Sequence, residues 1–176
     1  MRYALIDTDL GTFGLAWTEH GVARVALPSA DRARTEIWIS REPAEPGFPD
    51  KALSALPEMI RRYAAGELVD FSAVPVDFSE VPEFNRRVYA EALKLGYGET
   101  TTYGAIARTL GDLTFARAVG HALGANPIPL IIPCHRVLAS GGRTGGFSSP
   151  GGVSAKMRML ALEHAASPTG QYAFGF

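Results

Sequence analysis

The amino-acid sequence predicts a chain of two parts: an α/β N-terminal domain over residues 1–79 and a mostly α-helical C-terminal domain over residues 80–176. Short apolar segments on either side of a turn at Glu19-His20-Gly21 predict a β-hairpin in the first part. Three segments with apolar residues at helical spacing predict the second part. The composition changes near Ser79–Pro82, where we place the boundary between the two domains.

The N-terminal elements follow from local patterns. Met1–Ile6 is typical of a strand, and Gly14–Thr18 and Val22–Leu27 are typical of the two arms of a hairpin. Residues 41–49 contain three prolines and a glycine, which predicts a loop. The remaining elements that we expect are a helix capped by Ser29 or Asp31 and running toward Ile39, a helix from Asp50 to about Ala65 with Gly66 as its C-cap, and a short edge strand at Val74–Phe78.

The C-terminal part begins with a helix after Pro82, a residue suited to the first turn of a helix. Two short helices are expected next, one over Tyr103–Leu110 and one from an N-cap at Thr114 to about Ala125. A glycine-containing turn joins them, so the three helices form a helix-turn-helix pattern, although an ordinary helix pair has the same signature. A buried strand at Leu130–Ile132, a glycine-rich loop over residues 141–152 and a last helix from Val153 to about Ala165 complete the chain.

Composition narrows the classes of function. A single cysteine among 176 residues excludes an intramolecular disulfide framework and a cysteine-rich zinc site. We expect no metal, with a site at His121 and His135 as the weaker alternative, and no cofactor. The N-terminus resembles no signal peptide and no apolar run is long enough to span a membrane, so we expect a cytoplasmic protein that does not contact membranes.

Charge is unevenly distributed along the chain. The net charge is −1, but residues 101–176 carry six cationic side chains against two acidic ones, a balance of +4, and residues 1–100 therefore carry −5. This asymmetry is typical either of a basic working half or of chance combined with an acidic domain surface.

The segment Ile131–Val137 contains the one cysteine, Cys134, directly followed by His135. A thiol on a turn beside a base can act as a nucleophile. A free cysteine is also commonly just a small buried apolar residue. The pair alone therefore does not decide between catalysis and packing.

Residues 82–165 contain several separated signatures in order, and together they resemble the O6-alkylguanine-DNA alkyltransferases, the methylated-DNA–protein-cysteine methyltransferases. Pro133-Cys134-His135-Arg136-Val137 resembles the active-site pentapeptide of that family. Tyr103 and Arg117 stand fourteen residues apart, like the tyrosine and the arginine finger of the family. Arg117-Ala118-Val119-Gly120, Asn126-Pro127, Lys156 and Glu163 complete the resemblance.

The resemblance implies a ribonuclease-H-like N-terminal domain and a winged-helix-like DNA-binding C-terminal domain. It also implies a suicide reaction in which Cys134 takes the alkyl group from O6-alkylguanine, with O4-alkylthymine as a second candidate, after the base is flipped out of the duplex. His135 would take the thiol proton through a water and Glu163 would orient the imidazole. Tyr103 would bind or protonate the leaving guanine, and Asn126 would brace the turn. The implied partner is double-stranded alkylated DNA, bound at its minor groove by a monomer; in a bacterium the protein would be associated with the nucleoid.

The resemblance assigns two further groups of residues. The expected DNA contacts are Arg117, Ala118, Thr114, Tyr103, Gly120, His121 and Arg136. The expected pocket residues are Val137, Phe147, Ser148 and Ser149.

Two features depart from the family pattern. The loop after the cysteine is about two residues longer, at Ser149-Pro150, and His121 occupies a position that is usually small. These departures bear on the substrate range and the affinity for DNA. Two alternatives to dealkylation stay open: an alkylated-DNA lesion binder without turnover, and a thiol hydrolase or transferase that uses Cys134, His135 and Glu163.

Overall fold

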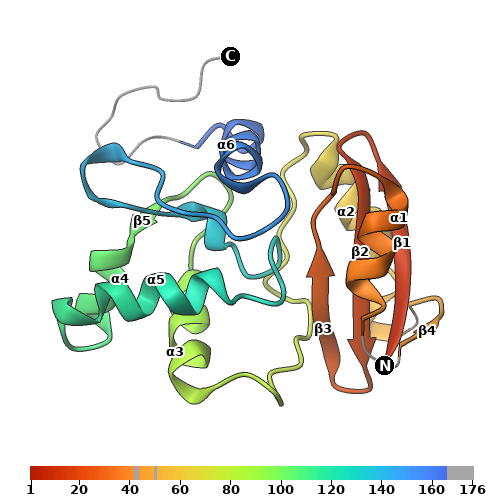
Figure 1. The fold of residues 1–176 in the computed structure, drawn as a ribbon, viewed down its shortest axis with the longest axis horizontal. Helices are drawn as coiled ribbons and strands as arrows, with labels where there is room; N and C mark the ends of the chain where they lie inside the picture. The colour runs from red at the N-terminus through yellow and green to blue at the C-terminus, as the bar shows by residue number, and fades with distance from the viewer. Residues whose placement is uncertain (42–43, 50, 166–176) are drawn as a thin grey trace. The chain divides into compact units, whose positions relative to one another are not determined.

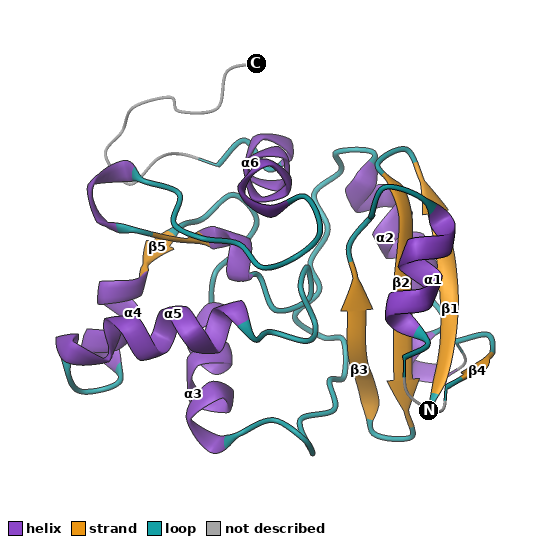
Figure 2. Cartoon of the chain, in the orientation of Figure 1, coloured by secondary structure: helices purple, strands orange, loops and turns teal. Residues whose placement is uncertain are grey.

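The computed structural model describes residues 1–41, 44–49 and 51–165. The chain divides into two compact units, one made of residues 1–80 and 127–131 and the other of residues 81–126 and 132–176. The division near residue 80 agrees with the predicted boundary. The sequence did not predict that residues 127–131 belong to the first unit. Figures 1 and 2 show the mixed α/β character of the first unit and the helical character of the second.

The first unit is built on a four-stranded sheet of order β3-β2-β1-β4. Strands β1 (Arg2–Thr8), β2 (Gly11–Thr18) and β3 (Gly21–Ala26) form an antiparallel meander, and β4 (Glu45–Pro46) pairs with β1 in parallel. The predicted hairpin is confirmed. Gly21 has a φ of 138°, and a Cβ there would lie 2.5 Å from the carbonyl oxygen of Pro75, so this turn needs glycine.

Two helices accompany the sheet. Helix α1 (Arg32–Ile39) begins after Asp31, whose carboxylate accepts a hydrogen bond from the Arg34 amide, so Asp31 rather than Ser29 is the N-cap. Figure 1 shows α1 in front of the sheet, where Ile39 packs against Ala16 and Ala26. A 3₁₀ turn η1 (Lys51–Leu53) precedes helix α2 (Leu56–Ala64), which is shorter than predicted; the expected helix start at Asp50 and the loop residues 42–43 lie outside the described residues.

The edge strand predicted at Val74–Phe78 is wrong: these residues form only an isolated bridge between Val76 and Val22. Pro75 cannot donate to a ladder, although its carbonyl accepts from the Val22 amide at 2.9 Å.

The second unit contains helices α3 (Glu83–Ala92), α4 (Tyr103–Thr109), α5 (Ala116–Gly124) and α6 (Gly152–Leu162). The helical turn η2 (Leu113–Phe115) joins α4 to α5, as the helix-turn-helix pattern predicts. Thr114 is not the N-cap of α5; its amide donates to Asp112, which caps η2 instead. Among the described residues, no helix is both long and apolar enough to cross a membrane.

A pair of two-residue strands joins distant segments of the second unit. Strand β5 (Thr101–Thr102) runs parallel to β6 (Val137–Leu138), with Thr101 opposite Val137. Tyr103 begins α4 directly after β5, and the 3₁₀ turn η3 (Cys134–Arg136) directly precedes β6. The pairing therefore brings Tyr103 close to the segment that carries Cys134. A further 3₁₀ turn, η4 (Ser140–Gly142), opens the glycine-rich loop.

The strand predicted at Leu130–Ile132 is wrong. Leu130 is buried and has a φ of 78°, a conformation that interrupts an extended run. The chain turns here immediately before Pro133 and the segment that carries Cys134.

Candidate active site

Cys134 lies at the first position of η3, on a turn held by backbone hydrogen bonds. The Cys134 amide donates to the carbonyl of Ile132 at 2.8 Å, and the Arg136 amide donates to that of Pro133 at 2.9 Å. The Asn126 side-chain amide donates to the same Ile132 carbonyl at 3.0 Å. Asn126 thus lies where the sequence places it, at the base of the turn that presents the thiol.

The Cys134 thiol is nearly enclosed, with 5% of the residue exposed. Burial raises the pKa of this thiol, while a hydrogen bond with Asn126 and the charge of Lys156 act in the opposite direction. At neutral pH the group is therefore held as a thiol. Thiolate has to be generated by transfer of the proton to a neighbouring base.

His135 and Glu163 form a fully buried pair. The His135 Nε2 lies 2.8 Å from Glu163 Oε1, and both side chains have no exposed surface. Among the described residues, the His135 Nδ1 is the one buried side-chain nitrogen or oxygen without a hydrogen-bond partner. Burial lowers the pKa of His135, so the imidazole is neutral at pH 7. A neutral imidazole whose Nε2 donates to a carboxylate has a free lone pair on Nδ1.

Glu163 ends α6 as its C-cap residue rather than lying within the helix. Burial would raise the pKa of its carboxyl, but hydrogen bonds and charges from His135 and Arg136 outweigh this effect and hold the pKa well below its usual range. Glu163 is therefore ionised, and it can orient the imidazole without taking its proton.

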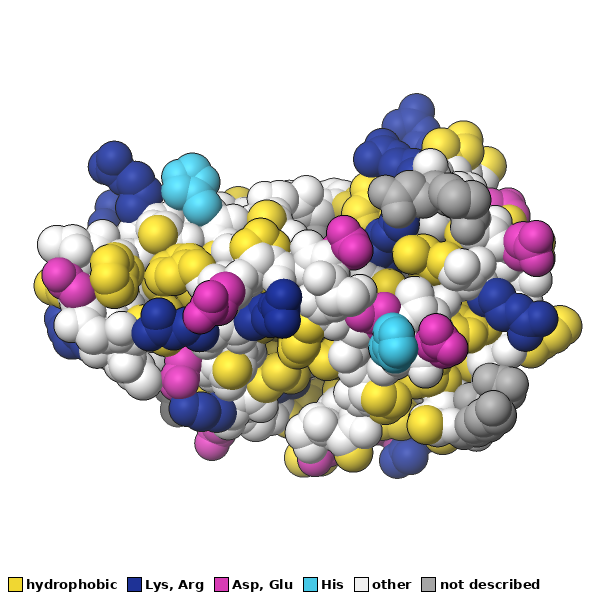
Figure 3. Space-filling view, turned by 90° about the horizontal axis from the view of Figure 1, so that it is seen from below, with side chains coloured by type: hydrophobic (Ala, Val, Ile, Leu, Met, Phe, Trp, Pro, Cys, Tyr) yellow, Lys and Arg dark blue, Asp and Glu magenta, His cyan; other side chains and the backbone are white. Residues whose placement is uncertain are grey.

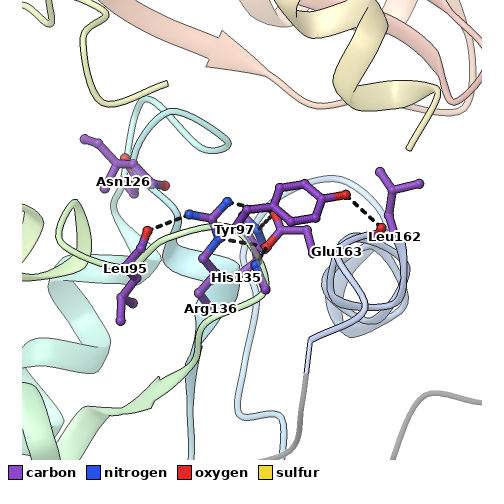
Figure 4. A network of polar contacts seen from close by, with 9 residues as sticks. Leu95, Tyr97, Asn126, His135, Arg136, Leu162 and Glu163 are labelled. Carbon is purple, nitrogen blue, oxygen red and sulfur yellow. Dashed lines mark hydrogen bonds and ion pairs between the residues drawn. The ribbon is translucent and has the colours of Figure 1, made fainter. Parts of the chain in front are cut away.

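Arg136 was predicted to contact DNA, and the structure contradicts this. Only 6% of the residue is exposed. Its Nε and Nη2 donate to Glu163 at 2.8 and 3.0 Å, and its Nη1 donates to the Leu95 carbonyl at 2.7 Å. Figure 4 shows the guanidinium between Leu95 and Glu163. The side chain belongs to the interior network and is not available to a phosphate.

Tyr103 stands beside the glycine-rich loop. Its hydroxyl is 3.5 Å from the Gly146 carbonyl and 3.4 Å from Lys156 Nζ, and that Nζ lies 5.6 Å from the ring centre. Burial, together with the charge of Cys134, raises the pKa of Tyr103, so the phenol keeps its proton. A Cβ at Gly145 would lie 2.8 Å from the Tyr103 ring and hydroxyl, so the ring rests against bare backbone.

Lys156 is fully buried, a position that sequence reasoning noted only as part of the family pattern. Its Nζ donates to the Val137 carbonyl at 2.6 Å, and burial lowers its pKa to about 8. The charge pattern alone could not reveal this role, because a lysine on a helix is usually solvated.

A cavity of about 360 Å³ opens at Cys134. The size suits a small organic group such as a nucleobase. It is lined by Tyr103, Arg117, Gly120, His121, Leu123, Gly124, Cys134, Gly146, Phe147 and Ser148. Most residues that the sequence assigned to the pocket or to DNA therefore meet around one cavity.

Val137 and Ser149 were predicted to line the pocket, and they do not line this cavity. The Val137 side chain is buried and its carbonyl accepts from Lys156. The Ser149 carbonyl accepts the Gly152 amide at 2.9 Å, which turns the chain into α6. Leu123 and Gly124 were missed; their helical spacing from Gly120 is the signal that could have found them.

Helix α5 presents an outer surface beside the cavity. Arg117, Ala118 and His121 are exposed on it, and Thr114 is exposed in the preceding turn. A Cβ at Gly120 would meet no atom within 4 Å, so the helix is open there. Small residues of this kind permit close approach of another backbone.

The surface charge of residues 101–176 is slightly weaker than their sequence balance of +4 indicates. Two of their six cations, Arg136 and Lys156, and one of their two acidic residues, Glu163, are buried. On the left side of Figure 3, cationic, acidic and apolar side chains of the second unit alternate instead of forming one basic patch. No group of three His, Cys, Asp or Glu side chains is placed to hold a metal ion within the described part of the chain. The absence of a metal and of a cofactor stays a prediction.

Comparisons with known proteins agree with the motifs. Residues 83–165 match the family model described as the DNA-binding domain of 6-O-methylguanine DNA methyltransferase. The methylated-DNA–protein-cysteine methyltransferase of Mycolicibacterium paratuberculosis is 34% identical over 170 residues, covering 96% of this chain and 95% of the relative. The protein of that name from Mus musculus is 34% identical over 182 residues, covering 97% and 84%.

Solved structures give the same result. The crystal structure of Mycobacterium tuberculosis OGT in complex with DNA has a TM-score of 0.75 and 34% identity, and the match covers 93% of this chain and 92% of that one. At this identity and coverage, with the cysteine motif and its buried His135–Glu163 pair in place, the chain belongs to the family of methylated-DNA–protein-cysteine methyltransferases.

Proposed function

We propose that this protein repairs alkylated DNA by transferring the alkyl group from O6 of guanine, and secondarily from O4 of thymine, to Cys134. The observation that carries the proposal is the position of the thiol: it opens into a cavity lined by Tyr103 and Arg117, and the adjacent His135 is backed by Glu163. Each chain acts once, because no residue at the site is suited to hydrolysing the thioether that forms.

The first step is removal of the thiol proton. His135 accepts it on Nδ1 through a bridging water, and the imidazolium that forms is stabilised by the Glu163 carboxylate. The negative charge that develops on sulfur is stabilised by Lys156 and Asn126, both of which favour the ionised form of Cys134. These groups together make a reactive thiolate from a thiol that burial keeps protonated at rest.

The second step is a single substitution. The thiolate attacks the alkyl carbon, a carbon–sulfur bond forms, and the bond from that carbon to O6 breaks with its electron pair left on guanine. The raised pKa of Tyr103 keeps its phenol protonated at rest, and the phenol hydrogen-bonds the guanine ring or donates its proton to it as the base leaves. The amide of Ser148 and the carbonyl of Cys134, both on residues that line the cavity, hold the edge of the base.

The target carbon lies inside the base stack of a duplex, so the nucleotide has to be flipped into the cavity at a cost of a few kcal/mol. Helix α5 enters the minor groove, and Arg117 fills the space that the base leaves. Exposure of Arg117, Ala118 and Thr114 and the open space at Gly120 support this placement. His121 lies at the mouth of the cavity, where it contacts the phosphate backbone.

The finer fold assignments belong to the same proposal. The order β3-β2-β1-β4, with three antiparallel strands and a parallel fourth, supports a ribonuclease-H-like first unit. The helix-turn-helix of α4 and α5, with the β5–β6 pair, supports a winged-helix-like second unit. We infer a monomer that acts in the cytoplasm on chromosomal DNA.

A turnover experiment separates this function from its two alternatives. The protein is mixed with a tenfold excess of duplex DNA containing O6-methylguanine, and restored guanine is counted over time. Dealkylation should stop at one equivalent, and a Cys134→Ser variant should restore none. Binding without repair would favour the lesion binder, and repair beyond one equivalent or cycling on small thioesters would favour the thiol hydrolase.

A further inference from the structure

Arg136 directly follows the Cys134-His135 pair, yet it faces away from the DNA surface. Its guanidinium gives two hydrogen bonds to one carboxylate and one to a backbone carbonyl. An arginine held in this fork geometry is a fixed positive charge, because its planar donors match both carboxylate oxygens at once.

The Glu163 carboxylate has two partners at each oxygen. Oε1 is 2.8 Å from His135 Nε2 and 3.0 Å from Arg136 Nη2. Oε2 accepts from Arg136 Nε at 2.8 Å and from the Gly98 amide at 3.1 Å. A carboxylate offers about four lone-pair positions, so this one is saturated as an acceptor. It cannot take a proton from the imidazole without breaking one of these bonds.

The pairing also cancels charge around the imidazole. Glu163 alone would favour an imidazolium, but the Arg136 cation neutralises it, and Lys156 adds a second positive charge nearby. Burial then decides the outcome and favours the neutral ring. The charged groups that act on His135 are Glu163 directly after α6, Arg136 on η3 and Lys156 on α6. Arg136 also acts on Glu163, and Tyr97 before β5 interacts with Glu163.

We propose that Arg136 is a positioning residue for alkyl transfer: it holds Glu163 as a saturated carboxylate and keeps His135 neutral, with its proton on Nε2 and its Nδ1 free to accept the proton of Cys134. This inference rests on the proposed function, in which His135 is the base. It explains why a cation beside the nucleophile is turned inward.

Arg136 could instead have a purely structural role, in which it links Leu95 to Glu163 by hydrogen bonds. Loss of that link would lower the rate of reaction of Cys134 equally at every pH. Loss of the charge instead moves the pH at which the base becomes protonated, because a nearby like charge shifts an ionisation by roughly one to three units.

The test measures the reaction of Cys134 with iodoacetamide as a function of pH. In this reaction a sulfur–carbon bond forms, iodide leaves, and the thiol proton passes to His135. Cys134 is the one cysteine of the sequence, so the rate reports this site alone. The proteins compared are the wild type, Arg136→Met, Arg136→Lys, and the control Arg87→Met, whose exposed guanidinium also donates to a backbone carbonyl, that of Leu110.

We expect the acid limb of the profile to move to higher pH by about one unit or more in Arg136→Met. In Arg136→Lys, which keeps the charge but loses the fork, the limb should stay near that of the wild type while the rate falls. Arg87→Met should change neither. A lower rate in Arg136→Met with an unmoved limb overturns the proposal.

A second measurement needs no variant, and it decides the question if Arg136→Met does not fold. Long-range ¹⁵N–¹H spectra of the wild type with labelled histidine report the tautomer at pH 7. The proposal requires a neutral His135 with its proton on Nε2, and an imidazolium or an Nδ1–H tautomer contradicts it. Neither measurement uses DNA, so a wild type that fails to dealkylate O6-methylguanine refutes the proposed function and not these results.

Discussion

The Nε2 of His135 lies 2.8 Å from Oε1 of Glu163, and neither side chain has any exposed surface. This contact joins His135, which directly follows Cys134, to Glu163 at the C-terminal end of α6. The glycine-rich loop lies between these two residues in the sequence. Burial lowers the pKa of His135, so the imidazole is neutral at pH 7. We therefore expect this contact to affect both the reactivity of Cys134 and the stability of the second unit.

Replacement of Glu163 by Gln should slow alkyl transfer. An amide cannot stabilise the imidazolium, and general-base catalysis typically contributes about 10² to 10⁴-fold. The single-turnover rate with O6-benzylguanine should fall within that range. Glu58→Gln is the matched control, because Glu58 forms an exposed ion pair with Arg61 that contributes little. Equal rates for the wild type and Glu163→Gln would remove Glu163 from the mechanism.

The same variant should be less stable. Removing one partner of a buried ion pair leaves Arg136 uncompensated, at a cost of about 3–5 kcal/mol. Urea unfolding at pH 7 should show this loss for Glu163→Gln and almost none for Glu58→Gln. A loss below about 1 kcal/mol would mean that the guanidinium finds another partner or water.

Acid should destabilise the wild type more than Glu163→Gln. The pKa of Glu163 is lower in the folded protein than its unfolded value of about 4.3, so its contribution is present above that pH and lost as the pH falls below it. The pKa of His135 is also lowered, so the unfolded chain takes up a proton first and stability declines below about pH 6.5. Urea unfolding at pH 7, 5 and 4 gives the comparison. His135 and the carboxyls of Asp7, Asp77 and Asp112, whose pKa values are also lowered, act in both proteins. The wild type should therefore show an additional loss below pH 5, and parallel curves there would contradict the prediction.

Gly145→Ala should displace Tyr103. The new Cβ would lie 2.8 Å from the Tyr103 hydroxyl, on a residue whose φ of 73° disfavours a side chain. We expect at least a tenfold slower reaction with O6-methylguanine in a duplex, equivalent to about 1.4 kcal/mol. Gly141→Ala is the control in the same loop, because Gly141 has a similar φ of 72°, its Cβ would meet no atom within 4 Å, and it does not line the cavity. If the two variants react at the same rate, the Tyr103–Gly145 contact has no part in catalysis.

Arg117→Ala should separate base flipping from chemistry. Repair of duplex O6-methylguanine should slow at least tenfold, since flipping costs a few kcal/mol, while reaction with free O6-benzylguanine should change little. Arg108→Ala removes an exposed arginine of α4 that does not line the cavity, and it should affect duplex repair only weakly. Equal losses on both substrates with Arg117→Ala would exclude the finger role.

The sequence predicts Cys134 and His135 as a nucleophile and base from their residue types and adjacency, and the family resemblance implies Tyr103 and Glu163. In the structure Cys134 and Tyr103 line one cavity, and His135 contacts Glu163. The direction of Arg136 was not predictable in this way. In a 3₁₀ turn consecutive side chains point to different sides, so a cation beside the nucleophile can face DNA or the interior.

The turn before the active site shows a second limit. Leu130 looks like part of an apolar strand, but its positive φ is imposed by packing and not by its own preference. Burial of Lys156 has the same origin, since a helix that appears amphipathic from its sequence can direct a long side chain inward to reach a carbonyl. Local sequence patterns reflect the conformational preferences of residues. The backbone conformation of Leu130 and the burial of Lys156 depend instead on tertiary contacts, which these patterns do not contain.

The most direct test of the account is the mass of the protein after reaction. The wild type is incubated with duplex DNA containing O6-methylguanine, and the intact mass and the peptide map are then recorded. We predict one added methyl group per chain, located on Cys134. A methyl group on another residue, or no gain in mass from DNA that the protein binds, would contradict the central claim that Cys134 is the alkyl acceptor.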